Sequence, residues 1–124
     1  MKPSRLAPLS VCVAVLLCVA AGCSKRTVMS PSEGRLAAAL AISDTIKRDN
    51  ALGAVADFAG QAGDAETVKK AVLKMGDSIK RDNAADLAAQ ALAKAGKRTD
   101  AAAVARMMGD AVKRDNTLSK LAEK

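Results

Sequence analysis

The sequence repeats itself every 33 residues, and this period constrains the fold more than any other feature. The tetrapeptide Lys-Arg-Asp-Asn occurs three times, beginning at Lys47, Lys80 and Lys113. A fixed period of about 20–50 residues is typical of proteins built from stacked copies of one supersecondary unit, and about three units are needed for a stable stack. The chain therefore holds close to the minimum number of units.

Each period contains two segments whose apolar residues have helical spacing. In the first segment these residues recur at i, i+3, i+4, i+7 and i+10, which is one face of a helix. They are Leu52, Val55, Ala56, Ala59 and Ala62, and one period later Ala85, Ala88, Ala89, Leu92 and Ala95. Leu118, Leu121 and Ala122 continue the pattern in the third copy. This pattern predicts a helix that begins near each Asp-Asn pair.

The second segment repeats in the same register. Its apolar positions are Ala38, Ala39, Ile42 and Ile46, then Ala71, Val72, Met75 and Ile79, then Val104, Ala105, Met108 and Val112. Gly63 and Gly96 are placed to end the first helix, and Asp64 and Thr99-Asp100 to start the next. Ser30, Pro31 and Glu33 have the order of a capping box with proline at the first helical position.

These signals together predict an all-α fold over residues 33–124. The arrangement is a short right-handed stack of antiparallel helical hairpins with about six helices. A coiled coil is the structural alternative, but glycines interrupt any long heptad run. Alanine dominates the apolar residues and Phe58 is the one aromatic residue, so we expect closely packed helices around a thin core.

The composition disfavours catalysis. The chain has no His, which is the commonest general base and metal ligand, and none of its three Cys lies beyond Cys23. No phosphate-binding glycine loop is present. We therefore expect no enzyme activity, no cofactor, no metal and no small-molecule substrate.

The first 22 residues have the layout of an export signal. Lys2 and Arg5 precede an apolar run of uncharged residues from Leu6 to Ala21, as in a secretory signal peptide. The run is shorter than the roughly 20 residues that a membrane-spanning helix needs. Removal of the segment would lower the formal net charge from +7 to +5.

The sequence Ala20-Ala21-Gly22-Cys23 resembles the lipobox of bacterial lipoproteins, although that family usually has Leu where this chain has Ala20. The resemblance implies cleavage before Cys23 and acylation of its thiol, with residues 23–32 as the lipidated N-terminus and tether. Two acyl chains suffice for stable anchoring. Ser24 implies export to the outer membrane in a bacterium with two membranes, so the expected location is the periplasmic face of that membrane.

The repeat itself resembles tetratricopeptide-type helical hairpins, whose period is usually 34 residues. Ala56 and Ala89 match that family's small residues in the first helix, Gly63 and Gly96 match its turn, and Ala101 matches the second helix. The family's Trp, Tyr and closing Pro are missing, and Val68 replaces a small residue. The resemblance implies a protein-interaction module.

The basic residues of the repeated tetrapeptide are the candidate partner-binding site. They are Lys47, Arg48, Lys80, Arg81, Lys113 and Arg114, here called the Lys-Arg row. Under a structural interpretation, Lys and Arg complement the C-terminal dipole of the shorter helix, and Asp or Asn caps the longer one. Under a binding interpretation, the row attracts an acidic protein or anionic envelope polymer. Nucleic acid is not expected, because the chain has no aromatic residues for base stacking beyond Phe58.

Two functions are consistent with these features. The first is a membrane-anchored lipoprotein that acts as a protein-interaction module or accessory subunit in the bacterial cell envelope. The alternative is a structural lipoprotein that tethers the membrane to the cell wall, since Lys124 at the end of the chain resembles the terminal Lys of the murein-linked lipoprotein.

Overall fold

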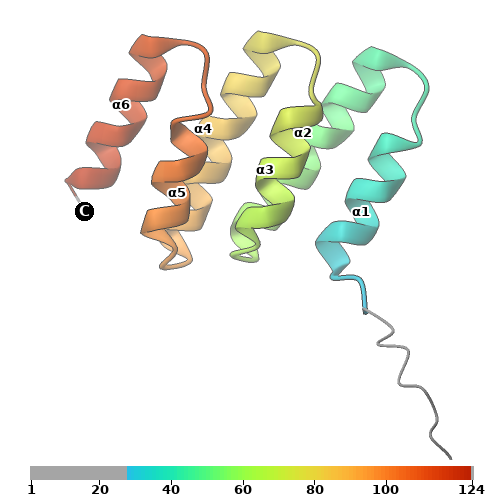
Figure 1. Cartoon of the computed structure of the whole chain (residues 1–124), viewed down its shortest axis with the longest axis horizontal. Helices are drawn as coiled ribbons and strands as arrows, with labels where there is room; N and C mark the ends of the chain where they lie inside the picture. Colours follow the sequence, from blue (N-terminus) through green and yellow to red (C-terminus); the bar gives the residue numbers. More distant parts are fainter. Residues whose placement is uncertain (1–27, 124) are drawn as a thin grey trace, which may run out of the picture.

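The repeated pattern folds into three helical hairpins. The computed structural model describes residues 28–123, which contain six helices and no strand. The helices are α1 (Pro31–Leu40), α2 (Thr45–Gln61), α3 (Ala65–Lys74), α4 (Ser78–Lys94), α5 (Arg98–Ala105) and α6 (Ala111–Ala122). The shorter helices α1, α3 and α5 lie side by side in one layer, α2 and α4 lie behind them, and α6 packs against α4 and α5 at the end of the stack (Figure 1). The predicted all-α stack of hairpins is confirmed.

The turn after each long helix is set by glycine, as the sequence predicts. Gly63 and Gly96 have φ angles of 74° and 80°, which side chains with a Cβ rarely adopt. The Asp64 amide donates to the Ala59 carbonyl at 2.8 Å and the Gly63 amide to Gly60 at 3.1 Å. This pair of bonds is a Schellman motif, which ends α2 and turns the chain into α3.

The helix starts are capped by aspartate and serine side chains. The predicted capping box is present at α1, where Ser30 accepts from the Glu33 amide and Glu33 accepts from the Ser30 amide. Asp64 caps α3 as predicted. Lys97, without a side-chain cap, precedes α5, so the predicted start at Thr99-Asp100 is wrong: both residues lie inside the first turn of that helix.

The largest difference from the sequence prediction concerns where the long helices begin. Asp44, Asp77 and Asp110 are their N-caps, so each long helix starts four residues before the Asp-Asn pair. The predicted caps at Asp49, Asp82 and Asp115 are therefore wrong. Ile46, Ile79 and Val112 consequently belong to the first turn of the long helices and are 66–73% exposed, not part of the shorter helix's buried face.

The core is thin and rich in alanine. Its largest fully buried apolar side chains are Leu52, Leu92, Val68, Val72 and Val104. The predicted stripe of α2 is buried from Leu52 to Ala59, but Ala62 is exposed because it is the C-cap. The third copy is less buried, since Leu118 and Leu121 only pack against the edge of the core.

A glycine allows the two central helices to approach closely. A Cβ on Gly60 of α2 would lie 3.0 Å from the Ala88 carbonyl oxygen and 3.1 Å from the Ala91 Cβ of α4. Gly34 of α1, in contrast, has no atom within 4 Å of its Cβ position. Small residues at such contacts set the distance between helix axes.

These two glycines should respond oppositely to the same substitution. We expect Gly60→Leu to cost about 1–3 kcal/mol, because the added side chain forces α2 and α4 apart. Gly34→Leu should stabilise by up to about 1 kcal/mol through helix propensity. Urea unfolding followed by circular dichroism measures both. Equal effects at the two positions would contradict the close packing of α2 on α4.

No helix between residues 28 and 123 is both long and apolar enough to cross a bilayer.

Candidate functional site

The repeated Lys-Arg-Asp-Asn lies within the first two turns of each long helix. Lys47 and Arg48 are the third and fourth residues of α2, and the two later copies have the same place in α4 and α6. The basic pairs therefore sit near helix N-termini, where the dipole does not favour cations. The predicted role in complementing a helix C-terminus is wrong, because the chain has already turned into the long helix at Asp44.

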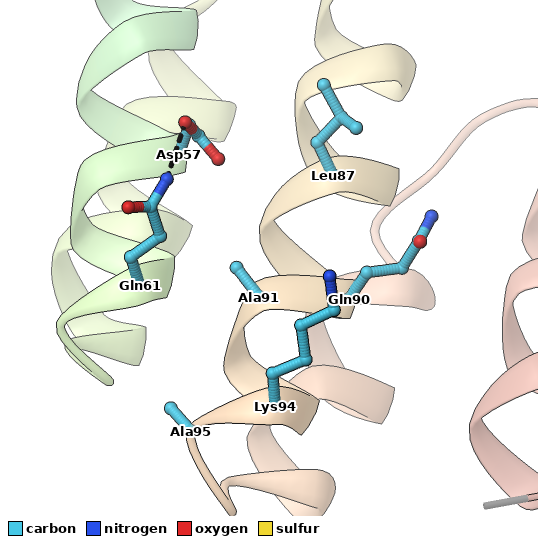
Figure 2. Close-up of a pocket in the computed structure, with 7 residues that line it drawn as sticks. All are labelled: Asp57, Gln61, Leu87, Gln90, Ala91, Lys94 and Ala95. Carbon is cyan, nitrogen blue, oxygen red and sulfur yellow. Dashed lines mark hydrogen bonds between the residues drawn. The ribbon is translucent and has the colours of Figure 1, made fainter.

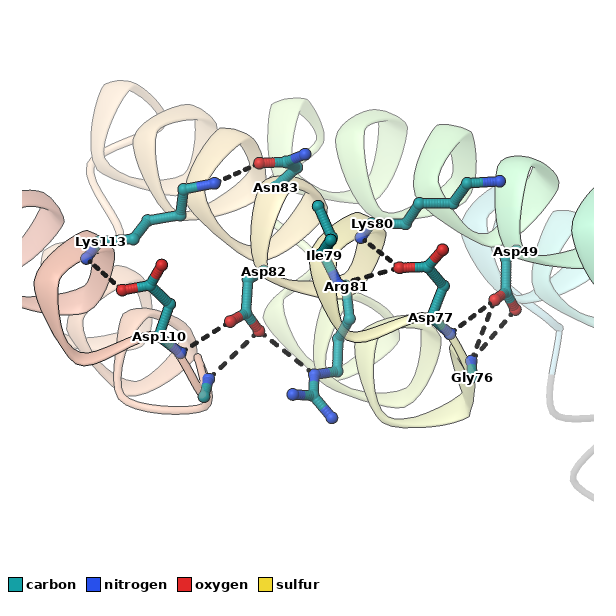
Figure 3. A network of polar contacts seen from close by, with 11 residues as sticks. Asp49, Gly76, Asp77, Ile79, Lys80, Arg81, Asp82, Asn83, Asp110 and Lys113 are labelled. Carbon is teal, nitrogen blue, oxygen red and sulfur yellow. Dashed lines mark hydrogen bonds and ion pairs between the residues drawn. The ribbon is translucent and has the colours of Figure 1, made fainter.

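The aspartate of the motif joins one repeat to the next. Asp49 is 4% exposed, and its carboxylate accepts from the Gly76 amide at 3.1 Å and the Asp77 amide at 2.9 Å. Asp82 is 5% exposed and accepts from the Gly109 amide at 3.2 Å and the Asp110 amide at 2.8 Å. Figure 3 shows both carboxylates pointing at the loop of the following unit. We call this arrangement the inter-repeat staple.

The lysine and asparagine of the motif add a second link at each contact between consecutive units, which we call a joint. The Lys80 ammonium donates to the Asn50 side-chain oxygen at 2.8 Å, and Lys113 makes the same bond to Asn83. Both links are exposed, so each stabilises by little. Arg81 and Arg114 lie beside their neighbouring aspartates at 3.3 and 3.4 Å. The structure thus engages much of the Lys-Arg row in contacts between and within repeats.

The surroundings of the two staple carboxylates lower their pKa values. The Asp77 amide is the main cause that holds the pKa of Asp49 below its usual range, and it outweighs burial. Burial alone would raise the pKa of Asp82, but the Asp110 and Gly109 amides and the Arg81 guanidinium bring it below its usual range. Both groups are therefore carboxylates at neutral pH, as hydrogen-bond acceptors for amides must be.

A pH dependence of stability follows from these two shifts. Because the folded pKa values are lowered, the staple contributes fully above the unfolded pKa of about 3.9 and its contribution is lost as pH falls through the folded values. The stability difference between the wild type and Asp49→Asn/Asp82→Asn should be largest near neutral pH and shrink below about pH 4. Urea titrations across this range measure the difference. A constant difference would show that ionisation of the two groups does not matter.

A second candidate site is a groove between α2 and α4, on the outer face of the long-helix layer. It encloses about 410 Å³ and is lined by Asp57, Gln61, Leu87, Gln90, Ala91, Lys94 and Ala95 (Figure 2). Gln61 donates to Asp57 at 2.9 Å, and Gln90 donates to Asp86 at 3.0 Å. Leu87 is 58% exposed. The groove therefore combines an exposed aliphatic side chain with amides, an acid on α2 and a lysine on α4.

Sequence reasoning missed the groove, although one signal pointed to it. Leu87 is the one large apolar residue at its position in the repeat, where the first and third units have Ala54 and Lys120. A large apolar residue outside the buried stripe of a helix can belong to a contact surface or can be isolated on the surface. The sequence alone does not distinguish these two cases, whereas the placement of α2 beside α4 does.

Two further predictions concern residues that the structure does not describe. Cys23 and Lys124 lie outside the described residues. Among residues 28–123, no group of three or more His, Cys, Asp and Glu side chains is placed to hold a metal ion. No family model, curated protein or solved structure matches the chain.

Proposed function

We propose that this protein is a lipid-anchored interaction module of the bacterial cell envelope, which holds a segment of a partner protein in the groove between α2 and α4. The anchor is the acylated Cys23, supported by the basic residues, apolar run and small residues that precede it. The module is the stack of hairpins, an architecture that presents extended surfaces for binding.

The observation that carries the binding site is the exposed Leu87 among polar groups. Leu87 is 58% exposed, so a partner that covers this aliphatic side chain removes apolar surface from water, which favours binding. Asp57, Gln61, Gln90 and Lys94 line the same groove and offer polar groups that can orient a peptide. The partner chemistry that suits the groove is a chain segment with an aliphatic side chain between polar groups.

A pair of leucine variants tests the site. Leu87→Glu should abolish capture of the partner, because a charge replaces the apolar contact. Leu73→Glu is the matched control: Leu73 is 70% exposed but lies on α3, in the other layer. The measurement is affinity purification of the full chain from its host's membranes, with bound proteins identified by mass spectrometry. Loss of the same partners from both variants, or from neither, would contradict the groove.

The same purification tests the Lys-Arg row as a competing binding edge. Most of its members already contact neighbouring residues, which favours a structural role. Lys47→Glu removes a row charge that contacts neither of the two internal joints within the described residues, so it should leave capture of the groove's partner unchanged. If instead Lys47→Glu or added salt releases the partner while Leu87→Glu does not, the row is the binding site.

The alternative function, a tether between membrane and cell wall, rests on Lys124. A muropeptide mass added to Lys124 after digestion of the cell wall would support that function in place of the interaction module.

A further inference from the structure

The two ends of the stack carry the two halves of one joint. At both internal joints, an aspartate accepts from two loop amides of the following unit, and a lysine of that unit donates to the preceding asparagine. The first unit has the donors of such a joint: the Ser43 and Asp44 amides and the Lys47 ammonium. Within residues 28–123, none of these three groups has a hydrogen-bond acceptor.

The last unit has the matching acceptors. Asp115 has the motif position of the buried Asp49 and Asp82, but its side chain is 72% exposed and its one described partner is the adjacent Arg114. Asn116, which corresponds to Asn50 and Asn83, is exposed and makes no side-chain hydrogen bond in the described part of the chain. The acceptors at one end therefore complement the donors at the other.

The first unit also presents an open apolar face. Ala38, Ala39, Ile42, Ala51, Ala54 and Val55 line a shallow hollow of about 310 Å³ together with Arg35. One period later, the preceding unit covers the residue that corresponds to Ala38: Ala38 is exposed, whereas its counterparts Ala71 and Val104 are fully buried. Arg35 does not close this face, because its guanidinium lies 3.8 Å from the centre of the Phe58 ring in the same unit.

We propose that copies of this chain associate head to tail, with the last unit of one copy on the first unit of the next. Asp115 of one copy accepts from the Ser43 and Asp44 amides of the other, and Asn116 accepts from Lys47. The joint repeats the internal one, so the 33-residue period continues from copy to copy. Such a contact is heterologous and leaves one free face on each copy, so growth is open-ended. This inference does not depend on the proposed peptide groove or on acylation.

The external joint should be weaker than the internal ones. Helix α6 has 12 residues, compared with 17 in α2 and α4. It therefore lacks the part of the long helix where Gly60 contacts Ala88 and Ala91 across the first joint. Association should accordingly depend on protein concentration.

Two surface variants block one face each. Ala38→Arg places a charge on the apolar face of the first unit, and Asp115→Arg removes the staple acceptor of the last unit. Both positions are exposed, so the helical signal should be unchanged. Glu66→Arg makes the same change of charge as Asp115→Arg, but at a 75% exposed side chain of the middle unit, and is the control.

The test is sedimentation equilibrium of the full chain in density-matched detergent over a broad dilution series. The wild type and Glu66→Arg should form dimers, trimers and larger species as concentration rises, whereas each blocked variant should remain a monomer. A mixture of Ala38→Arg and Asp115→Arg should form dimers and nothing larger, because each supplies the face that the other lacks. A monomeric wild type, a wild type that stops at the dimer, or a mixture that stays monomeric would overturn the proposal.

Discussion

Asp49→Ala combined with Asp82→Ala is expected to destabilise the protein by about 3–6 kcal/mol, a large part of the roughly 5–15 kcal/mol that holds a small domain folded. Each carboxylate accepts two amide hydrogen bonds from the next unit. A hydrogen bond to a charged group contributes about 1.5–3 kcal/mol, and partial hydration of the exposed loop amides limits the loss to about that amount at each joint. Urea unfolding followed by circular dichroism measures the change.

Asp115→Ala is the matched control for the staple. This residue has the same place in the motif and in its helix, but its side chain is exposed and no unit follows it within the described residues. We expect a change of at most about 0.5 kcal/mol under dilute conditions, as for other surface substitutions. If Asp115→Ala lowers the free energy of unfolding as much as each of the other two substitutions does, the aspartate acts only within its own helix, and the staple is wrong.

Cys23→Ala is expected to abolish membrane anchoring. The proposed anchor is acylation of this thiol, and two acyl chains, at about 0.8 kcal/mol for each buried methylene, are what make such anchoring stable. The variant should therefore accumulate as uncleaved precursor or as a product released from the membrane fraction. Fractionation of cells and mass spectrometry of the mature N-terminus measure both outcomes.

The signal segment supplies a control for this change. Cys18 has the same side chain but lies within the apolar run, five residues before Cys23. Cys18→Ala should be processed and anchored as the wild type is. A mature chain that begins at another residue, or an unmodified Cys23 on a membrane-bound protein, would contradict the lipoprotein proposal.

The sequence was sufficient to predict the hairpins but not where the long helices begin. Gly63 and Gly96 end helices through their own backbone geometry, so local chemistry locates those turns. The start of the long helix is less clear: in the first unit, Asp44, Asp49 and Asn50 are all residue types that make good N-caps. The aliphatic Ile46 also continued the apolar spacing of the shorter helix, which favoured the later start.

Contacts between consecutive units determine where each long helix begins. The sequence of a single unit does not show these contacts. Asp49 is buried because the next loop lies over it, a contact across 27 residues of sequence. The groove was beyond sequence reasoning for the same reason, since Leu87 belongs to it only when α4 lies beside α2. The 33-residue recurrence of Asp44, Asp77 and Asp110 was the one sequence signal that marked the true caps.

The central claim is that the repeated Lys-Arg-Asp-Asn holds the units together, and amide hydrogen exchange tests it most directly. In dilute wild-type protein, the amides of Gly76, Asp77, Gly109 and Asp110 should be protected from exchange, because staple carboxylates accept from them. The amides of Ser43 and Asp44, which have the same loop position without an aspartate before them, should exchange rapidly. Asp49→Asn should weaken protection at Gly76 and Asp77 alone. Equal exchange in all three loops, or protection that survives the substitution, would contradict the claim.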